Sequence, residues 1–401
     1  MATVDLGREL SARTGPRWAG VGRSLETDPW AAGVQAADRA LEGRPAELMM
    51  LFACAGHANA ELLAGVAERA PGAKLIGCSV PSHISSDGPG EEGVLALALG
   101  GAGFRVSTAA AASQEGPRAA GQRAAERLKR ADSPATRELV MLLTASQAGD
   151  QNEIIRGAYG ELGAGVPLVG GCTSQNSSSA SASCQFHGRD VHEDAVVAAS
   201  LMTDGPFGVG VRHGLSRIGE PIVVSRSQGG RVLELDGQPA LDAYLEMLDA
   251  PPEARQDPDA FTNFALAHPL GLSRSSGPDQ ARCIGAADFE DRALLCVAEV
   301  PQGSLAWLLH EDAGTTISAA VRACQEAVGD LGGAEPRAVI VFDCIGRRKL
   351  LGDEGAREEV RALKTAAAGA PLAGFYTHGE IARTHGLRGF HNKTVVVLAL
   401  G

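Results

Sequence analysis

One pattern recurs along the sequence and limits what the chain can fold into. An apolar segment that ends in glycine and small polar residues comes first, and a run of aliphatic and β-branched residues typical of a buried strand follows it. The four copies carry their glycines at Gly77, Gly170, Gly285 and Gly374. Successive copies lie about 90 to 115 residues apart, which is too long for a solenoid repeat. We therefore expect repeated subdomains that arose by duplication.

Strands alternate with helices along the chain. Segments with helical spacing of apolar residues stand between short apolar runs, which predicts an α/β class (α+β with mixed sheets) built from strand-helix-strand-strand subunits. The predicted helices are 30–41, 59–69, 118–130, 152–162, 239–248, 315–328 and 355–367. The main predicted strands are 48–54, 75–78, 93–99, 138–145, 167–173, 195–202, 207–213, 222–225, 231–235, 338–344, 372–376 and 392–400.

The subunits group into two predicted domains. The first, 26–225, holds two copies of the pattern, and the second, 226–401, holds the other two. In the third copy the pattern is abbreviated to short strands at 264–267, 283–287 and 293–300.

The charge and hydropathy of the chain argue against nucleic acid and membranes as binding partners. The formal net charge is −12, which argues against non-specific binding to nucleic acid or to an anionic membrane, because such binding needs basic patches. Residues 1–15 carry charges where a signal peptide needs an apolar core. No apolar run approaches the roughly 20 residues of a membrane span. We expect a cytoplasmic protein.

The cysteines do not have metal-binding spacing. The closest two of the eight, Cys172 and Cys184, are twelve residues apart, so the chain has no CxxC motif and no zinc-finger pattern. Several lie inside apolar strand patterns. We expect reduced, buried thiols.

Several segments together are similar to a known family. They are VRHG at 211–214, VLELDGQPA at 232–240, Cys344 with Arg347-Arg348 and Leu351-Gly352, PLAGFYTHGEI at 371–381 and GFHN at 389–392. In order and spacing they extend over nearly the whole chain and resemble the FIST proteins (F-box and intracellular signal transduction), which have an N-terminal and a C-terminal FIST domain. The family pattern usually has an aromatic residue where His378 stands.

The resemblance implies a sensory module that binds a small ligand, for which amino acids have been proposed. Family members occur fused to kinases, cyclic-nucleotide enzymes or chemotaxis output domains, and some bacterial members resemble haem-bearing nitric oxide sensors. This chain has no room for an output domain. The resemblance therefore implies signalling through a separate protein partner.

Three strand ends open into glycine and small polar residues at equivalent points of the pattern. In α/β sheets ligands bind at the carboxyl ends of strands, and glycine lets a ligand approach backbone amides. The alternative is a tight turn that needs glycine for packing alone. No phosphate-loop or GxGxxG signature is present, so no nucleotide is predicted. The candidate ligand-binding residues are Gly77, Cys78, Ser79, Gly171, Cys172, Thr173, Cys344, Arg347, Tyr376, Thr377, His378, Glu380 and Asn392.

Two charged residues among these suit an amino-acid-like ligand. Arg347 and its neighbour Arg348 follow strand 338–344, and one of these arginines could clamp a carboxylate through two hydrogen bonds, while Glu380 follows strand 372–376 and could take an amine. The favoured alternative is an internal Arg–Glu salt bridge at the end of the sheet, since semi-buried charges are usually paired.

Two chemical alternatives remain open. Cys344 with His378 as base would make a thiol-dependent enzyme, but a buried apolar thiol is the favoured interpretation. His213, His378 or His385 could ligate haem, yet a single histidine has no specific signature and ordinary polar histidines are favoured. The sequence therefore predicts a non-catalytic sensor without a cofactor, with a haem-bound gas sensor and a thiol enzyme as the alternatives.

Overall fold

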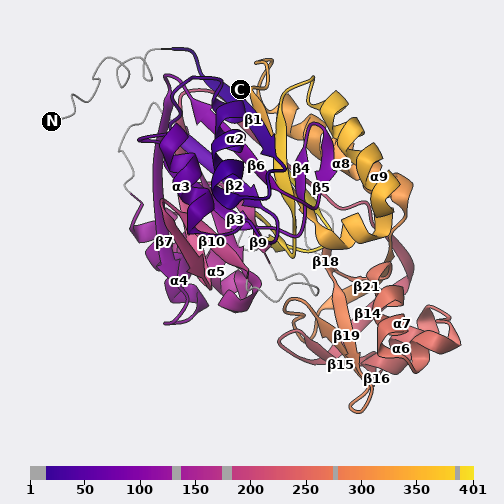
Figure 1. Cartoon of the computed structure of the whole chain (residues 1–401). Coiled ribbons are helices and arrows are strands. Elements are labelled where there is room, and N and C mark those ends of the chain that lie inside the picture. Colours follow the sequence, from indigo (N-terminus) through magenta and orange to yellow (C-terminus); the bar gives the residue numbers. More distant parts are fainter. Residues whose placement is uncertain (1–14, 129–136, 174–182, 274–278, 384–388) are drawn as a thin grey trace.

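The computed structural model describes residues 15–128, 137–173, 183–273, 279–383 and 389–401. These residues form a core of three α/β units and a smaller inserted domain that extends from one end of the core, at the lower right of Figure 1. The α/β class with mixed sheets is therefore confirmed.

The three core units share one order of elements: strand, helix, strand, helix, strand, hairpin, strand. Unit 1 consists of β1 (Trp18–Ser24), α2 (Pro29–Leu41), β2 (Leu48–Ala53), α3 (Ala60–Arg69), β3 (Lys74–Ser79), the hairpin β4 (His83–Ser85) and β5 (Gly88–Gly90), and β6 (Val94–Gly100). Unit 2 consists of β7 (Phe104–Ala112), α4 (Pro117–Glu126), β8 (Arg137–Ala145), η1 (Ser146–Ala148), α5 (Gln151–Leu162), β9 (Leu168–Thr173), the hairpin β10 (Cys184–His187) and β11 (Asp190–Glu193), and β12 (Ala195–Thr203). Unit 3 consists of β13 (Phe207–Arg212), α8 (Ala313–Gly329), β22 (Ala338–Cys344), α9 (Ile345–Ala366), β23 (Leu372–Thr377), the hairpin β24 (Glu380–Arg383) and β25 (Phe390–His391), and β26 (Val395–Leu400).

Each unit gives its hairpin to the sheet of another unit. Within a unit the last strand lies between the first and the second, and the second and third strands are parallel. The hairpin β4–β5 of unit 1 then extends the sheet of unit 3 beside β23, β10–β11 of unit 2 extends that of unit 1 beside β3, and β24–β25 of unit 3 extends that of unit 2 beside β9. The exchange is cyclic, so no unit can leave the core without breaking two sheets.

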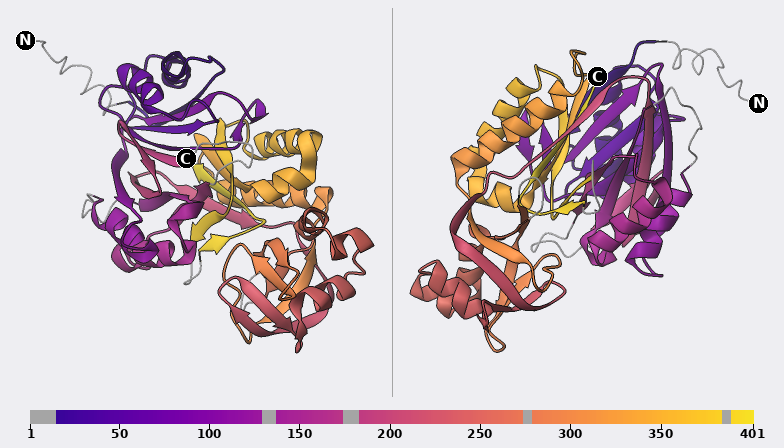
Figure 2. Two further views of the ribbon diagram at one scale, coloured as in Figure 1. Left: turned by 60° about the horizontal axis from the view of Figure 1, so that its bottom comes forward. Right: turned by 180° about the vertical axis from the view of Figure 1, so that it is seen from behind.

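The three sheets pack their inner faces against one another. Phe52, Phe342 and Phe375 meet at the centre, with the ring of Phe375 5.1 Å from that of Phe52 and 5.7 Å from that of Phe342. A pair of helices covers the outer face of each sheet: α2 with α3, α4 with α5, and α8 with α9 (Figure 2). Strands buried on both faces explain the continuous apolar runs in the sequence.

The repeated glycine is confirmed in three of its four copies. A Cβ on Gly77, Gly170 or Gly374 would lie 1.9 to 2.2 Å from a carbonyl oxygen of the neighbouring parallel strand, so only glycine fits. The prediction that Gly285 is a fourth copy is wrong, because the atom nearest to a Cβ there is 3.6 Å away and glycine is not required. Gly285 lies in an antiparallel hairpin of the inserted domain, without the helix-connected parallel pair of the core units.

The inserted domain interrupts unit 3 between its first strand and first helix. Its described residues form an eight-stranded antiparallel sheet and two α-helices. Its elements are β14 (Ser216–Gln228), β15 (Arg231–Leu235), β16 (Gln238–Pro239), α6 (Ala240–Met247), η2 (Pro252–Arg255), α7 (Pro258–Leu266), β17 (Leu270–Leu272), β18 (Gln280–Arg282), β19 (Ile284–Asp288), β20 (Ala293–Cys296) and β21 (Leu305–His310). The predicted strand at 264–267 is wrong, since most of it belongs to α7. The Asp257 side chain caps this helix by accepting the Ala260 N–H at 2.8 Å, and Pro258 is its first residue.

The division of the chain into domains at 26–225 and 226–401 remains a prediction. In space, the boundary between them falls inside β14, and strands from both sides share two of the core sheets. No helix of the described residues is long and apolar enough to cross a membrane.

Gly374→Ala tests the close strand contact. The added methyl would lie 1.9 Å from the carbonyl oxygen of Val341, so the two parallel strands must separate. We expect urea unfolding to show a loss of about 3 kcal/mol in the free energy of unfolding, or a protein that does not fold. Gly285→Ala is the matched control and should change this free energy by less than about 0.5 kcal/mol. Equal effects of the two substitutions would contradict the assignment of three repeat units.

Candidate functional site

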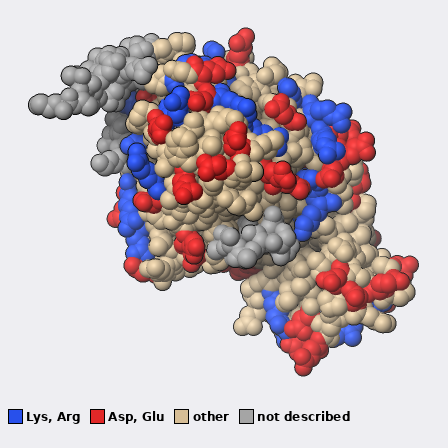
Figure 3. Space-filling model, viewed as in Figure 1, with Lys and Arg blue, Asp and Glu red and all other residues tan. Residues whose placement is uncertain are grey.

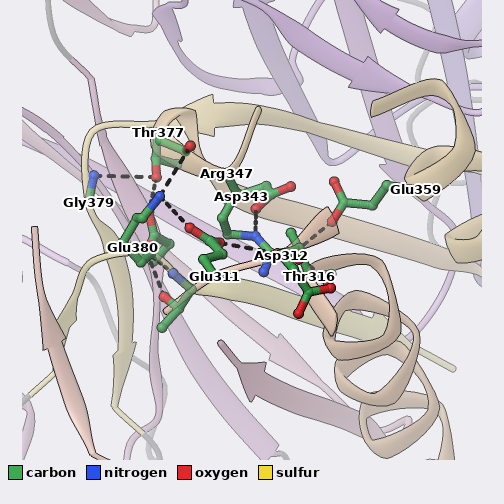
Figure 4. A network of polar contacts seen from close by, with 12 residues as sticks. Glu311, Asp312, Thr316, Asp343, Arg347, Glu359, Thr377, Gly379 and Glu380 are labelled. Atoms are coloured by element: carbon green, nitrogen blue, oxygen red, sulfur yellow. Dashed lines mark hydrogen bonds and ion pairs between the residues drawn. The ribbon is translucent and has the colours of Figure 1, made fainter. Parts of the chain in front are cut away.

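Buried polar side chains gather where two parallel strands of unit 3 end. The carboxyl ends of β22 and β23 lie side by side, with Cys344 opposite Thr377. The start of β24, the turn before β26 and the linker from the inserted domain to α8 meet them there, and Figure 4 shows Glu311 of this linker between Glu380 and Arg347. We refer to Cys344, Thr377, Glu380, Lys393, Thr394 and Glu311 as the polar centre.

Glu380 is a fully buried carboxyl group held by two threonines. Its Oε1 is hydrogen bonded to Thr377 Oγ1 at 2.5 Å, and its Oε2 accepts the Thr394 N–H at 3.1 Å and lies 2.5 Å from Thr394 Oγ1. Burial raises the pKa of Glu380 to about 8, although the hydrogen bonds from Thr377 and Thr394 act in the opposite direction. The group therefore keeps its proton at neutral pH.

Lys393 is buried with its charge. Its backbone is left-handed, with φ at 57°, and its side chain is 0% exposed. The ammonium forms an ion pair with the equally buried Glu311 and donates to the Gly346 carbonyl at 3.3 Å. Glu311 Oε1 in turn accepts a hydrogen bond from Thr316 Oγ1 at 3.3 Å. The pair thus joins the core to the linker of the inserted domain.

Arg347 forms a second buried cluster on the helix-covered side of β22. Its Nε donates to Asp343 Oδ1 at 2.6 Å, and its Nη2 donates to Glu359 Oε1 at 2.5 Å and to the Thr316 carbonyl at 3.1 Å. This bears out the alternative of an internal salt bridge, although the partners are Asp343 and Glu359 and not Glu380. Whether Arg347 also contacts a ligand remains a prediction.

Two carboxyl groups share this single arginine. Burial raises the pKa of Glu359 well above its usual range, and the neighbouring Asp343 raises it further, while Arg347 lowers it. A proton on Glu359 leaves the cluster electrically neutral, which is the less costly state for fully buried groups. The Tyr376 hydroxyl lies in the same cluster, and neither it nor Arg347 Nη1 has a hydrogen-bond partner among the described residues.

The thiols near the centre are protonated. Cys344 is buried, and burial followed by the nearby Glu380 raises the pKa of its thiol well above the usual range. A Cβ on Gly346 would lie 3.5 Å from Cys344 Sγ and 3.4 Å from Lys393 Nζ, so the thiol and the ammonium border the same glycine. A thiolate nucleophile needs the opposite pKa shift.

The predicted residues of unit 1 lie apart from the centre. Gly77 makes the close strand contact, and Cys78 belongs to the central core. Ser79 Oγ accepts the Cys184 N–H at 2.9 Å, so it holds the hairpin β10–β11 that unit 2 contributes. Of these three residues, Ser79 therefore holds the borrowed hairpin, and a ligand contact by any of them remains a prediction.

Those of unit 2 lie beside the centre, because β9 pairs with β24. A Cβ on Gly171 would lie 2.5 Å from Thr377 Cγ2, and the Cys172 N–H donates to the Gly379 carbonyl at 2.8 Å. Thr173 instead donates to the Thr144 carbonyl at 3.3 Å within its own unit.

The remaining predicted residues differ in their surroundings. Asn392 is buried, and its Oδ1 has no hydrogen-bond partner among the described residues. Burial and the neighbouring Lys349 lower the pKa of His378 to about 4, so it is a neutral imidazole. Among the described ranges no group of three or more His, Cys, Asp and Glu side chains could hold a metal ion.

Haem binding by His213, His378 or His385 remains a prediction, and the structure bears only on the proton position of His213. His213 Nδ1 accepts the Leu215 N–H at 3.3 Å. In a neutral imidazole this places the proton on Nε2, which then has no lone pair for iron. His385 lies outside the described residues.

Five residues of the two clusters were not predicted: Asp343, Glu359, Glu311, Lys393 and Thr394. Asp343 gives one signal, as an acid inside the apolar run AVIVFDC. A lysine before a β-branched run is ordinarily an exposed turn residue, so the sequence gives no sign that Lys393 is buried.

Two family models match the sequence. That of the FIST N domain matches residues 47–238, and that of the FIST C domain matches residues 240–383. An uncharacterized protein of Mycobacterium bovis is 27% identical over 397 residues, covering 94% of this chain and 96% of that protein. An uncharacterized protein of Mycobacterium tuberculosis is 27% identical over 220 residues, covering 52% and 54%. Among solved structures, T. maritima PurL complexed with FGAR has a TM-score of 0.23 at 12% identity, covering 99% of this chain and 76% of that one, a likeness too low to carry an argument.

Glu380→Gln tests whether this carboxyl holds a proton. The folded state keeps the proton up to a pKa of about 8, whereas the ordinary value is 4.5. The stability that Glu380 contributes is therefore full below pH 4.5 and is lost as the pH rises toward 8. Relative to the variant, the wild-type free energy of unfolding should fall by about 1.4 kcal/mol per pH unit from pH 5 to 8. Urea unfolding at four pH values measures this, and a difference that does not change with pH would refute it.

Arg347→Met tests the second cluster. The substitution leaves Asp343 and Glu359 buried without a cation, so we expect the free energy of unfolding to fall by about 3 to 5 kcal/mol at pH 7. Glu359→Gln should cost much less, because it mimics the protonated carboxyl. Arg361→Met, at an exposed position of α9 beyond its kink at Gly352, is the control for a lost arginine. Similar losses in Arg347→Met and Arg361→Met would contradict the assignment.

Proposed function

Because the chain belongs to the FIST family, we propose that it is a non-catalytic sensor that binds a small polar ligand at the polar centre. FIST domains are sensory domains of signal transduction, which supports the general class. The ligand itself, which we propose to be an amino acid or a similar small molecule, is inferred from the chemistry of the centre.

The observation that carries the proposal is that the fold does not need the buried charges of Lys393 and Asp343, because the other two units have the same fold without them. By strand register, the position of Lys393 is occupied by the exposed Glu92 in unit 1 and by Asp194 in unit 2, and Asp194 shares the left-handed backbone of Lys393. The strand position of Asp343 is occupied by Ala53 and Thr144 in the other two units. A buried lysine in a left-handed conformation is costly, and such features persist where function maintains them.

The position of the centre suits a ligand site. It lies at the carboxyl ends of parallel strands, where ligands of α/β proteins usually bind, and at the junction with the inserted domain. The groups that we propose to surround the ligand offer neutral and charged hydrogen-bond partners: Cys344, Thr377, His378, Glu380, Asn392 and Lys393. An amino-acid-like molecule needs this mixture of partners for its carboxylate and amine.

Nucleic acid is not part of the proposal. The net charge is −12, and on the face shown in Figure 3 basic side chains are interspersed with acidic ones over the core. The negative net charge, together with the mixed charges of this face, disfavours the electrostatic attraction that nucleic-acid binding depends on. We propose instead that a separate signalling protein receives the signal.

The two chemical alternatives have less support. The protonated, buried Cys344 is unsuited to attack as a thiolate, and the proton position on His213 is unsuited to iron. We therefore propose that the protein has neither a catalytic thiol nor a haem cofactor.

Native mass spectrometry and a visible spectrum of the same unheated sample test this function. We expect a small colourless molecule to co-purify, to be removed on unfolding, and to rebind saturably in calorimetry. Glu380→Ala should weaken that binding at least tenfold, while Glu234→Ala in the inserted domain, far from the centre in sequence, serves as the control. A Soret band would support haem instead, and the absence of any saturable small-molecule binding would remove the sensor proposal.

A further inference from the structure

One residue of the polar centre has the properties of a ligand anchor. This inference rests on the proposed function and specifies the ligand. We propose that Lys393 binds the carboxylate of a small carboxylate-bearing molecule, and that Glu311 of the inserted domain's linker occupies this place when the ligand is absent.

The argument begins with the charge balance around Lys393. Its ammonium is 0% exposed and forms its ion pair with Glu311. The neighbouring acidic groups carry no charge at neutral pH, because burial raises the pKa of Glu380 to about 8 and that of Cys344 well above its usual range. If Glu311 withdraws, a buried cation is left uncompensated, at a cost of several kcal/mol. Another anion must then enter.

The contacts of Glu311 describe the anion that fits. One carboxylate oxygen faces the Lys393 ammonium and the other accepts the hydrogen bond of Thr316 at 3.3 Å. A ligand carboxylate has the same planar pair of oxygens and the same single charge, so it can take over both contacts. A phosphate would bring a second charge that Lys393 alone does not neutralise.

The position of Glu311 couples this exchange to the inserted domain. Two short connections join that domain to the core, 213–215 and 311–312, and Glu311 is the first residue of the second. Its backbone N–H donates to the Ala267 carbonyl of the inserted domain at 3.2 Å. Withdrawal of Glu311 therefore moves the end of β21 relative to α8, which reorients the inserted domain.

We expect reorientation of the inserted domain to break a further contact between that domain and the core. Gln280 of β18 donates to the Phe390 carbonyl of β25 at 2.9 Å, which holds the inserted domain on the core in the unliganded arrangement. A ligand that prefers the arrangement without Glu311 at Lys393 shifts the equilibrium by its difference in affinity. Occupancy of the anchor thus becomes a change of domain orientation.

Glu311→Gln in the full-length protein tests the anchor. The substitution preserves the shape of the side chain but removes its charge, so Lys393 should bind the simplest carboxylate, acetate, at least tenfold more tightly than in the wild type. Calorimetry gives the affinity, and the rise in Tm with sodium acetate over sodium chloride at equal ionic strength gives a second readout. The double variant Glu311→Gln/Lys393→Met should lose the acetate effect. Small-angle scattering should show a changed arrangement of the inserted domain.

Each outcome decides the inference separately from the sensor proposal. Equal acetate binding by Glu311→Gln and wild type, or acetate binding that survives in the double variant, would overturn the anchor. A co-purified ligand that binds Lys393→Met as tightly as wild type would overturn it too, yet would leave the sensor intact. If Glu311→Gln does not fold, Glu311→Asp, which retracts the carboxylate by one methylene, should show an intermediate gain in acetate affinity, and no gain would again overturn the anchor.

Discussion

The cyclic exchange of three hairpins is the constraint on which the rest of the structure depends. Each sheet of the core is completed by a hairpin from another unit, so every sheet contains strands of two units. The backbone hydrogen bonds of these borrowed strands cannot form until the neighbouring unit is in place, and the three inner faces then bury one common apolar core. The core is therefore one cooperative body, although its sequence is a repeat.

This closed arrangement creates a rigid frame for buried charges in one unit. The strand β24, which begins with Glu380, pairs with β9 of unit 2, while the threonines that hold Glu380 come from unit 3. The carboxyl is thus fixed from two units at once, and its desolvation follows from the exchange itself. Units 1 and 2 have the same order of elements but no buried lysine at the turn before their last strand. The topology is therefore common to all three units, whereas the polar centre belongs to unit 3.

The inserted domain gives unit 3 a second distinction. It enters between the first strand and the first helix of the unit, and its return linker carries Glu311 directly to Lys393. A domain joined at this point has short connections that end in a buried ion pair. The buried ion pair of Lys393 with Glu311 therefore ties the inserted domain's return linker to the polar centre.

The sequence by itself determined the class of fold, most of the helices and strands, and three of the repeated glycines, because these depend on local periodicity and on the absence of a side chain. It also included Cys344, Thr377 and Glu380 among thirteen candidate residues at strand ends, of which the structure brings these three together and leaves Gly77, Cys78 and Ser79 apart. Only the tertiary structure decided that Gly285 is not a repeat position, that Ser79 holds a borrowed hairpin, and that Lys393 is buried with Glu311. Those outcomes depend on contacts between distant segments, such as the bond from the Leu372 N–H to Ser86 Oγ across 286 residues, and no local pattern encodes such a partner. The burial of a charge is set by what packs over it, and here that cover comes from another unit and from the inserted domain.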